Sequence, residues 1–325
     1  MGERADTATL RTADLPTLAP CFWRAARRSA GHHLLFPLLQ PWLAAAEYLP
    51  RRASESIWSG IGSAAAALVP GAYARASSNI RCVFGADLHS DAVRAMAVHS
   101  LDAFARNSAD VPRLRRLSRS RLLDLVEIRG LEKLERALAA RRGVVGIAPH
   151  MGNWEVLACY LSARGVRVSA VAAALCDPRL GRYLADVRAR WGVATIVKDQ
   201  PRASRDAIAV LRRGEMLGTL MDLHTRGDAI RVPFLGRPSR VPAGPVRLAL
   251  RTGAALVPMW IVRGSAGRYS AEVLDPIDLG ASGSREADVE RGVRRAAAVL
   301  SEIILARPAE WLWMHNRWPA DVESA

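Results

Sequence analysis

Lysine is almost absent from this chain, although the chain is strongly basic. Only Lys133 and Lys198 occur among its 46 Lys and Arg residues, and 31 acidic residues leave a net charge of +15. Arginine makes planar, bidentate contacts with phosphate and carboxylate groups. A basic surface of this size attracts nucleic acid, anionic lipid or an acidic carrier protein.

Cysteine is also scarce, and its spacing excludes a small disulfide-stapled scaffold. The four cysteines form no CxxC pair and no cluster with histidine; they are Cys21, Cys82, Cys159 and Cys176. We expect buried free thiols in a reducing compartment, and the spacing predicts no metal site.

Long hydrophobic runs are missing too. No stretch approaches twenty uninterrupted strongly apolar residues, which excludes a polytopic membrane protein. Hydrophobic residues make up 50% of the chain and charged residues 24%, as in a packed globular protein rather than a disordered one. The start carries Glu3 and Asp6 and does not resemble a signal peptide.

The most apolar stretch, Leu34–Pro50, is 17 residues long and contains Pro37 and Pro41. This length is marginal for a membrane-spanning helix, and arginines on both flanks do not orient a span. The stretch favours a helix lying in the membrane interface, with aromatic anchors at Phe36, Trp42 and Tyr48. A helix of the protein core is the alternative.

The chain divides into three predicted regions. Residues 1–20 form a flexible N-terminus, residues 21–110 a helical, membrane-associating region, and residues 111–325 an α/β catalytic region. Strands are predicted at 125–128, 143–148, 166–172, 193–197, 216–221, 255–262 and 269–274. Helices are predicted at 91–106, 131–140, 154–163, 180–191, 202–213, 241–252 and 285–306. This alternation predicts an α/β fold with a largely parallel central sheet flanked by helices.

One histidine follows a predicted buried strand. The strand at 143–148 runs into His150, the chain turns at Gly152, and a helix starts near Trp154. Ligands bind at the carboxyl ends of strands in open α/β sheets. Glu155 lies in the first helical turn, where we expect its carboxylate to reach the imidazole of His150 as in a general base. A histidine followed by a glutamate is common, so chance remains the alternative.

No competing catalytic motif is present: the chain has no GxSxG, HExxH, P-loop or strand–GxGxxG–helix pattern. A long loop is predicted after residue 221, with no acidic residue between 231 and 251. Its arginines suit a phosphate-bearing substrate, and a solvated basic loop is the alternative. The candidate substrate-binding residues are Asn153, Asp222, Arg231, Arg237 and Arg240.

Three segments resemble the lysophospholipid acyltransferase superfamily. They are PHMGNWE at 149–155, VPFLGRPSRVPAGPVRLALRTGAALVPM at 232–259 and EWLWMHNRW at 310–318. The closest branch looks like the late (lauroyl and myristoyl) acyltransferases of lipid A biosynthesis and the related phosphatidylinositol mannoside acyltransferases. The likeness extends from about Ala44 to Pro319 and includes residues 78–85 and 130–135. Ala173 stands where the lipid A enzymes commonly have an arginine, which puts the acceptor in question.

The resemblance implies a glycerol-3-phosphate acyltransferase-like fold, with His150 as base and Glu155 as its partner. It implies transfer of a fatty acyl group from an acyl-carrier-protein or acyl-CoA thioester to a hydroxyl of a membrane glycolipid such as a lipid A precursor. It further implies no metal or cofactor, contact with an anionic membrane surface, and a place on the cytoplasmic face of the bacterial inner membrane.

Two alternatives remain at this point. One is a phosphatidylinositol mannoside-type or other phospholipid acyltransferase. The other belongs to a different class: a non-enzymatic basic protein that binds nucleic acid or anionic membrane. Against nucleic acid, the arginines are spread through the α/β units and no nucleic-acid-binding module is recognised.

Overall fold

The computed structural model describes residues 32–175, 177–225, 227–264, 267–280 and 282–318. The predicted flexible N-terminus, Cys21 and Cys176 lie outside these residues. Cys159 is buried and Cys82 half-buried, and both are free thiols.

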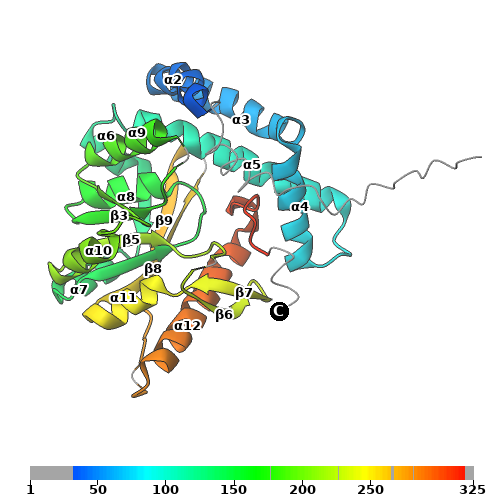
Figure 1. Ribbon diagram of the computed structural model, residues 1–325. Helices are drawn as coiled ribbons and strands as arrows, with labels where there is room; N and C mark the ends of the chain where they lie inside the picture. Colours follow the sequence, from blue (N-terminus) through cyan, green and yellow to red (C-terminus); the bar gives the residue numbers. More distant parts are fainter. Residues whose placement is uncertain (1–31, 176, 226, 265–266, 281, 319–325) are drawn as a thin grey trace, which may run out of the picture.

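A seven-stranded sheet forms the centre of the molecule, in the order β1-β9-β8-β2-β5-β3-β4 (Figure 1). Its strands are β1 Val126–Arg129, β2 Val144–Ala148, β3 Val168–Ala172, β4 Ala194–Val197, β5 Met216–Leu220, β8 Ala255–Arg263 and β9 Tyr269–Val273. Strands β8 and β9 pair antiparallel, and every other neighbouring pair in this sheet is parallel. The predicted α/β fold with a largely parallel sheet is confirmed.

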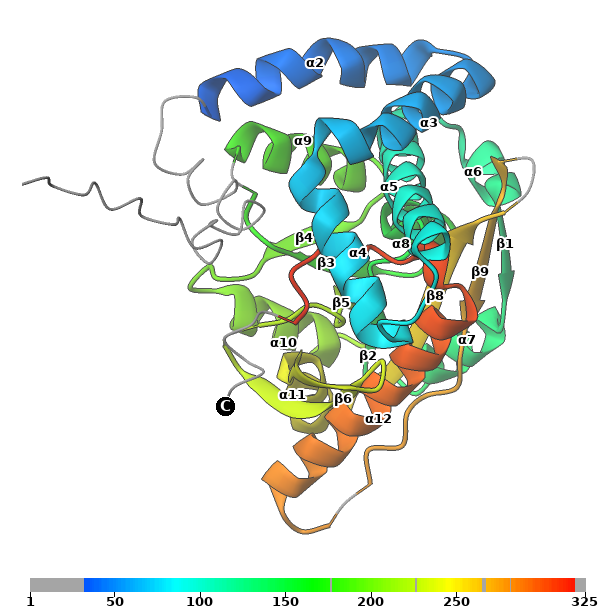
Figure 2. The same cartoon turned by 90° about the vertical axis from the view of Figure 1, so that its right-hand side faces the viewer.

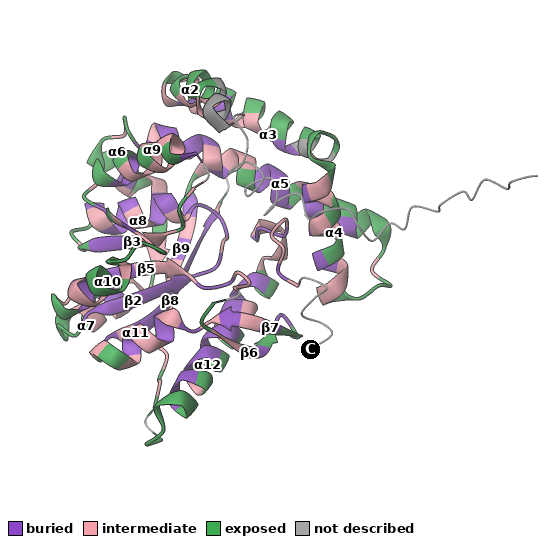
Figure 3. Cartoon of the chain, in the orientation of Figure 1, coloured by how far each residue is buried: buried purple, intermediate pink, exposed green. Residues whose placement is uncertain are grey.

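Helices cover both faces of the sheet, and each face has its own hydrophobic core. The helices are α6 Arg119–Leu125, α7 Leu131–Ala139, α8 Trp154–Ala163, α9 Pro178–Ala189, α10 Ala203–Arg212, α11 Gly244–Thr252 and α12 Arg285–Ala306. Val145 and Ile147 of β2 pack with α10, α11 and α12, whereas Val144 and Ala148 pack with α6 to α9. Alternate residues of a strand point to opposite faces, so a strand covered on both sides is apolar throughout. Figure 3 shows these strands as the buried layer of the molecule.

Four helices precede the sheet, as expected for this part of the chain: α2 His32–Tyr48, α3 Arg51–Leu68, α4 Pro70–Phe84 and α5 Ser90–Arg113. Helix α2 lies across one end of the molecule, and α4 runs toward the opposite end (Figure 2). Helix α3 packs closely on α5, since a Cβ at Gly62 would lie 2.4 Å from the Cα of Asp102. The predicted boundary at residue 110 falls inside α5.

In the described part of the chain, no helix combines the length and apolar character needed to cross a membrane. Phe36, predicted as an interfacial anchor, contacts the ring of Tyr183, at 6.5 Å between centroids. Trp42 and Tyr48 are 55% and 69% exposed.

The long loop predicted after residue 221 was wrong in part, because an antiparallel hairpin occupies much of it. Strands β6 Ala229–Phe234 and β7 Arg237–Pro242 pair across a turn in which Leu235 and Gly236 both have positive φ. The sequence did not indicate this hairpin, because its strands contain three prolines and its turn has no Asn-Gly or Asp-Gly pair.

Candidate active site

His150 pairs with Asp222 at the carboxyl ends of two neighbouring strands. Strands β2 and β5 are in register at Ala148 and Leu220, and the two polar residues each follow that pair by two positions. The imidazole Nδ1 lies 2.6 Å from Asp222 Oδ1, and the backbone N–H of His150 donates to Asp222 Oδ2 at 2.7 Å. Parallel register therefore joins two residues that are 72 positions apart in the chain.

The Asp222 carboxylate is fully buried and receives a third hydrogen bond, from Trp311 Nε1 at 2.6 Å. Burial alone raises the pKa of this carboxyl. The charge of His150 and the hydrogen bonds from His150 and Trp311 outweigh burial and lower the pKa of Asp222 to about 2. Asp222 is therefore ionised at neutral pH, so its oxygens only accept hydrogen bonds.

The ionised partner sets the tautomer of His150. Since a carboxylate can only accept, the proton of a neutral imidazole stays on Nδ1, and Nε2 keeps a free electron pair. The His150 side chain is 15% exposed, whereas that of Asp222 is 0% exposed. This arrangement can take a proton at Nε2 while Asp222 stabilises the imidazolium that forms.

The backbone around His150 is held on both sides. The carbonyl of His150 accepts from the N–H of Leu312 at 3.0 Å, and Met151 bridges to Trp311. Gly152 has a φ of +58°, and a Cβ there would lie 1.9 Å from the carbonyl oxygen of Ile261 on β8. Only glycine allows the chain to turn this close to the sheet. The backbone of the turn, and with it the imidazole, is therefore held in a single position.

Two rings contact the imidazole edge-on. The centroids of Trp154 and His315 lie 5.2 Å and 5.3 Å from that of His150. Burial, and next the charge of His150, lower the pKa of His315 to about 3. His315 therefore stays neutral near pH 7 and adds no second positive charge beside the base.

The expected pairing of Glu155 with His150 is wrong. Glu155 binds Arg188 of α9, with Arg188 Nε donating to Oε2 at 2.7 Å and Nη2 to Oε1 at 2.5 Å. Both side chains are 9% exposed. Glu155 lies on α8 beyond the turn at Gly152, and it joins α8 to α9 through a bidentate ion pair.

Asn153 was predicted to bind substrate, but the structure uses its side chain inside the protein. The amide is buried, its oxygen accepts from Val156 N at 3.2 Å and caps α8, and its nitrogen donates to Asn107 O and Tyr269 Oη. These contacts tie the start of α8 to α5 and β9. Asp222, also predicted as substrate-binding, is instead the buried partner of His150.

The three predicted arginines lie on the β6–β7 hairpin, and they differ in exposure. Arg231 and Arg237 are exposed. Arg240 is half-buried and donates from Nε to Thr225 O and from Nη2 to Gly227 O, both at 3.2 Å. Arg240 thus braces the segment between β5 and the hairpin.

The C-terminal segment contributes residues to which no role was assigned from the sequence. Trp311 and His315 both contact the His150–Asp222 pair. The signal for Asp222 was available, since an aspartate directly after a strand that neighbours the His150 strand meets it at one sheet edge. No spacing of nearby residues indicates that Trp311 reaches Asp222.

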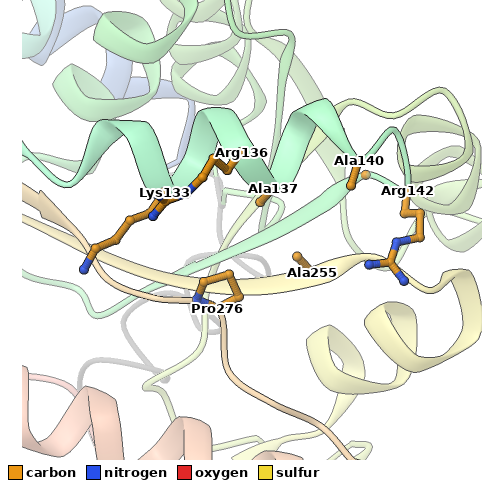
Figure 4. Close-up of a pocket in the computed structure, with 8 residues that line it drawn as sticks. Lys133, Arg136, Ala137, Ala140, Arg142, Ala255 and Pro276 are labelled. Atoms are coloured by element: carbon orange, nitrogen blue, oxygen red, sulfur yellow. The ribbon is translucent and has the colours of Figure 1, made fainter.

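A separate pocket lies at the opposite edge of the sheet (Figure 4). It is lined by Lys133, Arg136, Ala137, Ala140, Arg142, Gly143, Ala255 and Pro276. Gly143 and Ala255 stand at the amino ends of β2 and β8, so this pocket is not part of the His150 site. Within the described residues, no group of three or more His, Cys, Asp or Glu side chains could hold a metal ion.

The fold and the site define an α/β protein with a carboxylate-held histidine at the carboxyl edge of its sheet. The model of the bacterial lipid A biosynthesis acyltransferases matches residues 34–320. The chain therefore belongs to this family and is an acyltransferase.

Curated relatives support the same activity. The chain is 31% identical over 233 residues to a phosphatidylinositol mannoside acyltransferase of Mycobacterium tuberculosis, a match that covers 70% of this chain and 71% of the relative. It is 28% identical over 241 residues to the Mycolicibacterium smegmatis protein of the same name, covering 73% of this chain and 75% of the relative.

Proposed function

We propose that this protein is a membrane-associated O-acyltransferase that moves a fatty acyl group from a thioester to a hydroxyl of a glycolipid. The carrying observation is the 2.6 Å contact between His150 Nδ1 and Asp222, which leaves Nε2 as a base. The donor is an acyl-carrier-protein or acyl-CoA thioester.

In the first half of the reaction, the acceptor hydroxyl gives its proton to His150 Nε2 as its oxygen attacks the thioester carbonyl. The new C–O bond produces a tetrahedral oxyanion, for which the backbone N–H groups of Trp154 and Glu155 at the start of α8 are the proposed donors, since that of Val156 is used by the Asn153 cap. Asp222 balances the charge of the imidazolium. The C–S bond then breaks, and the leaving thiolate takes the proton from His150. General-base help of this kind contributes about 10²–10⁴-fold to rate.

For the acceptor we propose a phosphatidylinositol mannoside-type glycolipid, because the curated relatives carry that name. A lipid A precursor is the second candidate, favoured by the description of the matching family. The +15 net charge, nearly all of it from arginine, suits either acceptor, since both are anionic lipids.

We also propose that the N-terminal helices associate with an anionic membrane, on the cytoplasmic face of the bacterial inner membrane. Helices α2 to α4 expose large apolar side chains: Trp42, Tyr48, Ile57, Ile61, Leu68, Val69 and Phe84. Amphipathic helices with exposed aromatic rings bind in the interface of the bilayer. Sedimentation with phosphatidylglycerol vesicles should fall when Trp42 and Leu68 are both changed to serine.

The deciding test is acyl transfer by the purified full chain. Acyl-CoA and acyl-carrier-protein donors are each combined with phosphatidylinositol mannoside or a lipid A precursor, and the products are identified by mass spectrometry. We expect one acyl chain to be added to a hydroxyl of the mannoside. Transfer to the lipid A precursor alone would select the second candidate, and transfer to neither would reject the proposed function.

A further inference from the structure

Arg317 is a buried cation whose hydrogen-bonding capacity is mostly unused. Its side chain belongs to the C-terminal segment that holds Trp311 and His315, and the residue is 1% exposed. Nη1 donates to Arg240 O at 3.3 Å. Neither Nε nor Nη2 has a hydrogen-bond partner among the described residues.

The two unused donors lie on one edge of the guanidinium. The Nε–Nη2 edge presents two parallel N–H groups, which is the geometry that binds two oxygens of a phosphate or carboxylate. A buried donor without a partner lowers the stability of a protein, and a charged donor lowers it more. A partner that reaches this edge would therefore recover a large free energy.

Aromatic rings and the hairpin hold the guanidinium in place. Its central carbon lies 4.5 Å from the ring centroid of Phe234 on β6 and 5.9 Å from that of Trp318. Trp318 Nε1 donates to Ser239 Oγ on β7 at 2.7 Å. The side chain is thus preorganised, and little entropy is lost when an anion binds it.

Among the described residues, none forms an ion pair with Arg317. Burial lowers the pKa of Arg317 to about 10, and the charge of Asp222 partly opposes that shift, so the guanidinium is charged at neutral pH. The Asp222 oxygens already accept from His150 and Trp311. The guanidinium therefore interacts electrostatically with Asp222, the partner of the proposed base, and its Nε–Nη2 edge has no partner among the described residues.

We propose that the Nε–Nη2 edge of Arg317 binds a phosphate group of the substrate and so positions it beside His150. This inference rests on the proposed function, because both proposed substrates carry phosphate: the acceptor as a phosphodiester headgroup, the donor on its pantetheine arm. Arg317 thus takes the phosphate contact that the sequence predicted for the three hairpin arginines.

The first test measures binding without turnover. Glycerophosphoinositol, a soluble phosphodiester, should raise the melting temperature of the full wild-type chain, because a ligand that binds only the native state stabilises it; myo-inositol should not. Arg317→Gln should abolish this rise and Arg317→Lys should retain part of it. The matched control is Arg142→Gln, which removes one exposed charge at the opposite sheet edge and should leave the rise intact.

The second test separates the two sources of phosphate by steady-state kinetics. A bidentate charged contact is worth about 1.5–3 kcal/mol, so Arg317→Lys and Arg317→Gln should raise one KM by roughly tenfold to a hundredfold, with kcat little changed. A rise confined to the acceptor KM assigns the headgroup phosphate, and a rise confined to the donor KM assigns the pantetheine phosphate.

Two results would overturn the inference. One is an equal melting shift in wild type and both Arg317 variants; the other is a fall in kcat with both KM values unchanged. Should Arg317→Gln fail to fold, Arg317→Lys carries both tests. A melting shift that persists in a wild-type chain that transfers no acyl group would reject the proposed function and leave the phosphate site standing.

Discussion

Two buried carboxylates, Asp222 and Glu155, lie near the turn at Gly152, and they bind different partners. Asp222 is 72 positions from His150, yet it contacts the imidazole because β2 and β5 lie side by side in register. Glu155 is five positions from His150, yet it faces Arg188 on the neighbouring helix. The difference teaches that register across a sheet, rather than distance along the chain, decides which carboxylate acts on the base.

The largest expected effect separates the two carboxylates by activity. His150→Ala and Asp222→Asn should each lower kcat by roughly 10²–10⁴-fold, because the first removes the base and the second no longer fixes its tautomer or balances its charge. Glu155→Gln should leave the kcat of folded protein close to wild type. Steady-state acyl transfer, normalised to folded protein by circular dichroism, checks this. A fall in kcat as large in Glu155→Gln as in Asp222→Asn would show that Glu155 also supports the reaction.

The buried His315 beside His150 should make the stability of the protein depend on pH. The pKa of His315 is about 3 when folded, against 6.5 for the free side chain, so the unfolded chain binds an extra proton between those values. Stability is therefore fully present above about pH 6.5 and falls as the pH drops toward 3, by on the order of 5 kcal/mol.

Urea unfolding of wild type and His315→Gln at pH 7 and pH 4 measures this contribution. The variant should lose less stability than wild type between the two pH values. An identical slope in His315→Gln would mean that this imidazole is protonated in the native state.

Breaking the Glu155–Arg188 pair should lower stability and leave activity little changed. Glu155→Gln leaves the buried Arg188 guanidinium without its charge partner, so we expect the free energy of unfolding to fall by roughly 3–5 kcal/mol. The double variant Glu155→Leu/Arg188→Met removes both charges and should recover much of that loss. Urea unfolding of the single and double variants gives the coupling energy. A double variant no more stable than Glu155→Gln would show that the two side chains stabilise the fold through contacts other than their ion pair.

The smallest expected effect removes one of three hydrogen bonds to Asp222. Trp311→Phe deletes the Nε1 donor and should lower stability by about 1–3 kcal/mol. The kcat should fall less than in Asp222→Asn, since both bonds from His150 remain. Measuring kcat and the free energy of unfolding for Trp311→Phe and Asp222→Asn tests whether the aspartate substitution has the larger effect on kcat. A deeper loss of kcat in Trp311→Phe would assign the tryptophan a direct role at the substrate.

Much of the sheet followed from the sequence, because buried parallel strands are short apolar runs. The segment GVVGIA at 143–148 and the helix at Trp154–Ala163 were placed correctly, and this put His150 at the right edge. The hairpin at 229–242 could not be found in the same way, since its exposed Arg231 and Pro233 alternate with buried Val232 and Phe234. Pro233 argued against a strand at all.

The sequence by itself determined the class of fold, the histidine and its place after a strand, because local patterns of burial and turn residues carry that information. Only the tertiary structure decided the partner of the histidine, the use of Glu155, and the burial of Trp311 and Arg317 beside the site. Those contacts join residues far apart in the chain, and they depend on strand order and register. Strand order and register cannot be recognised from the spacing of nearby residues.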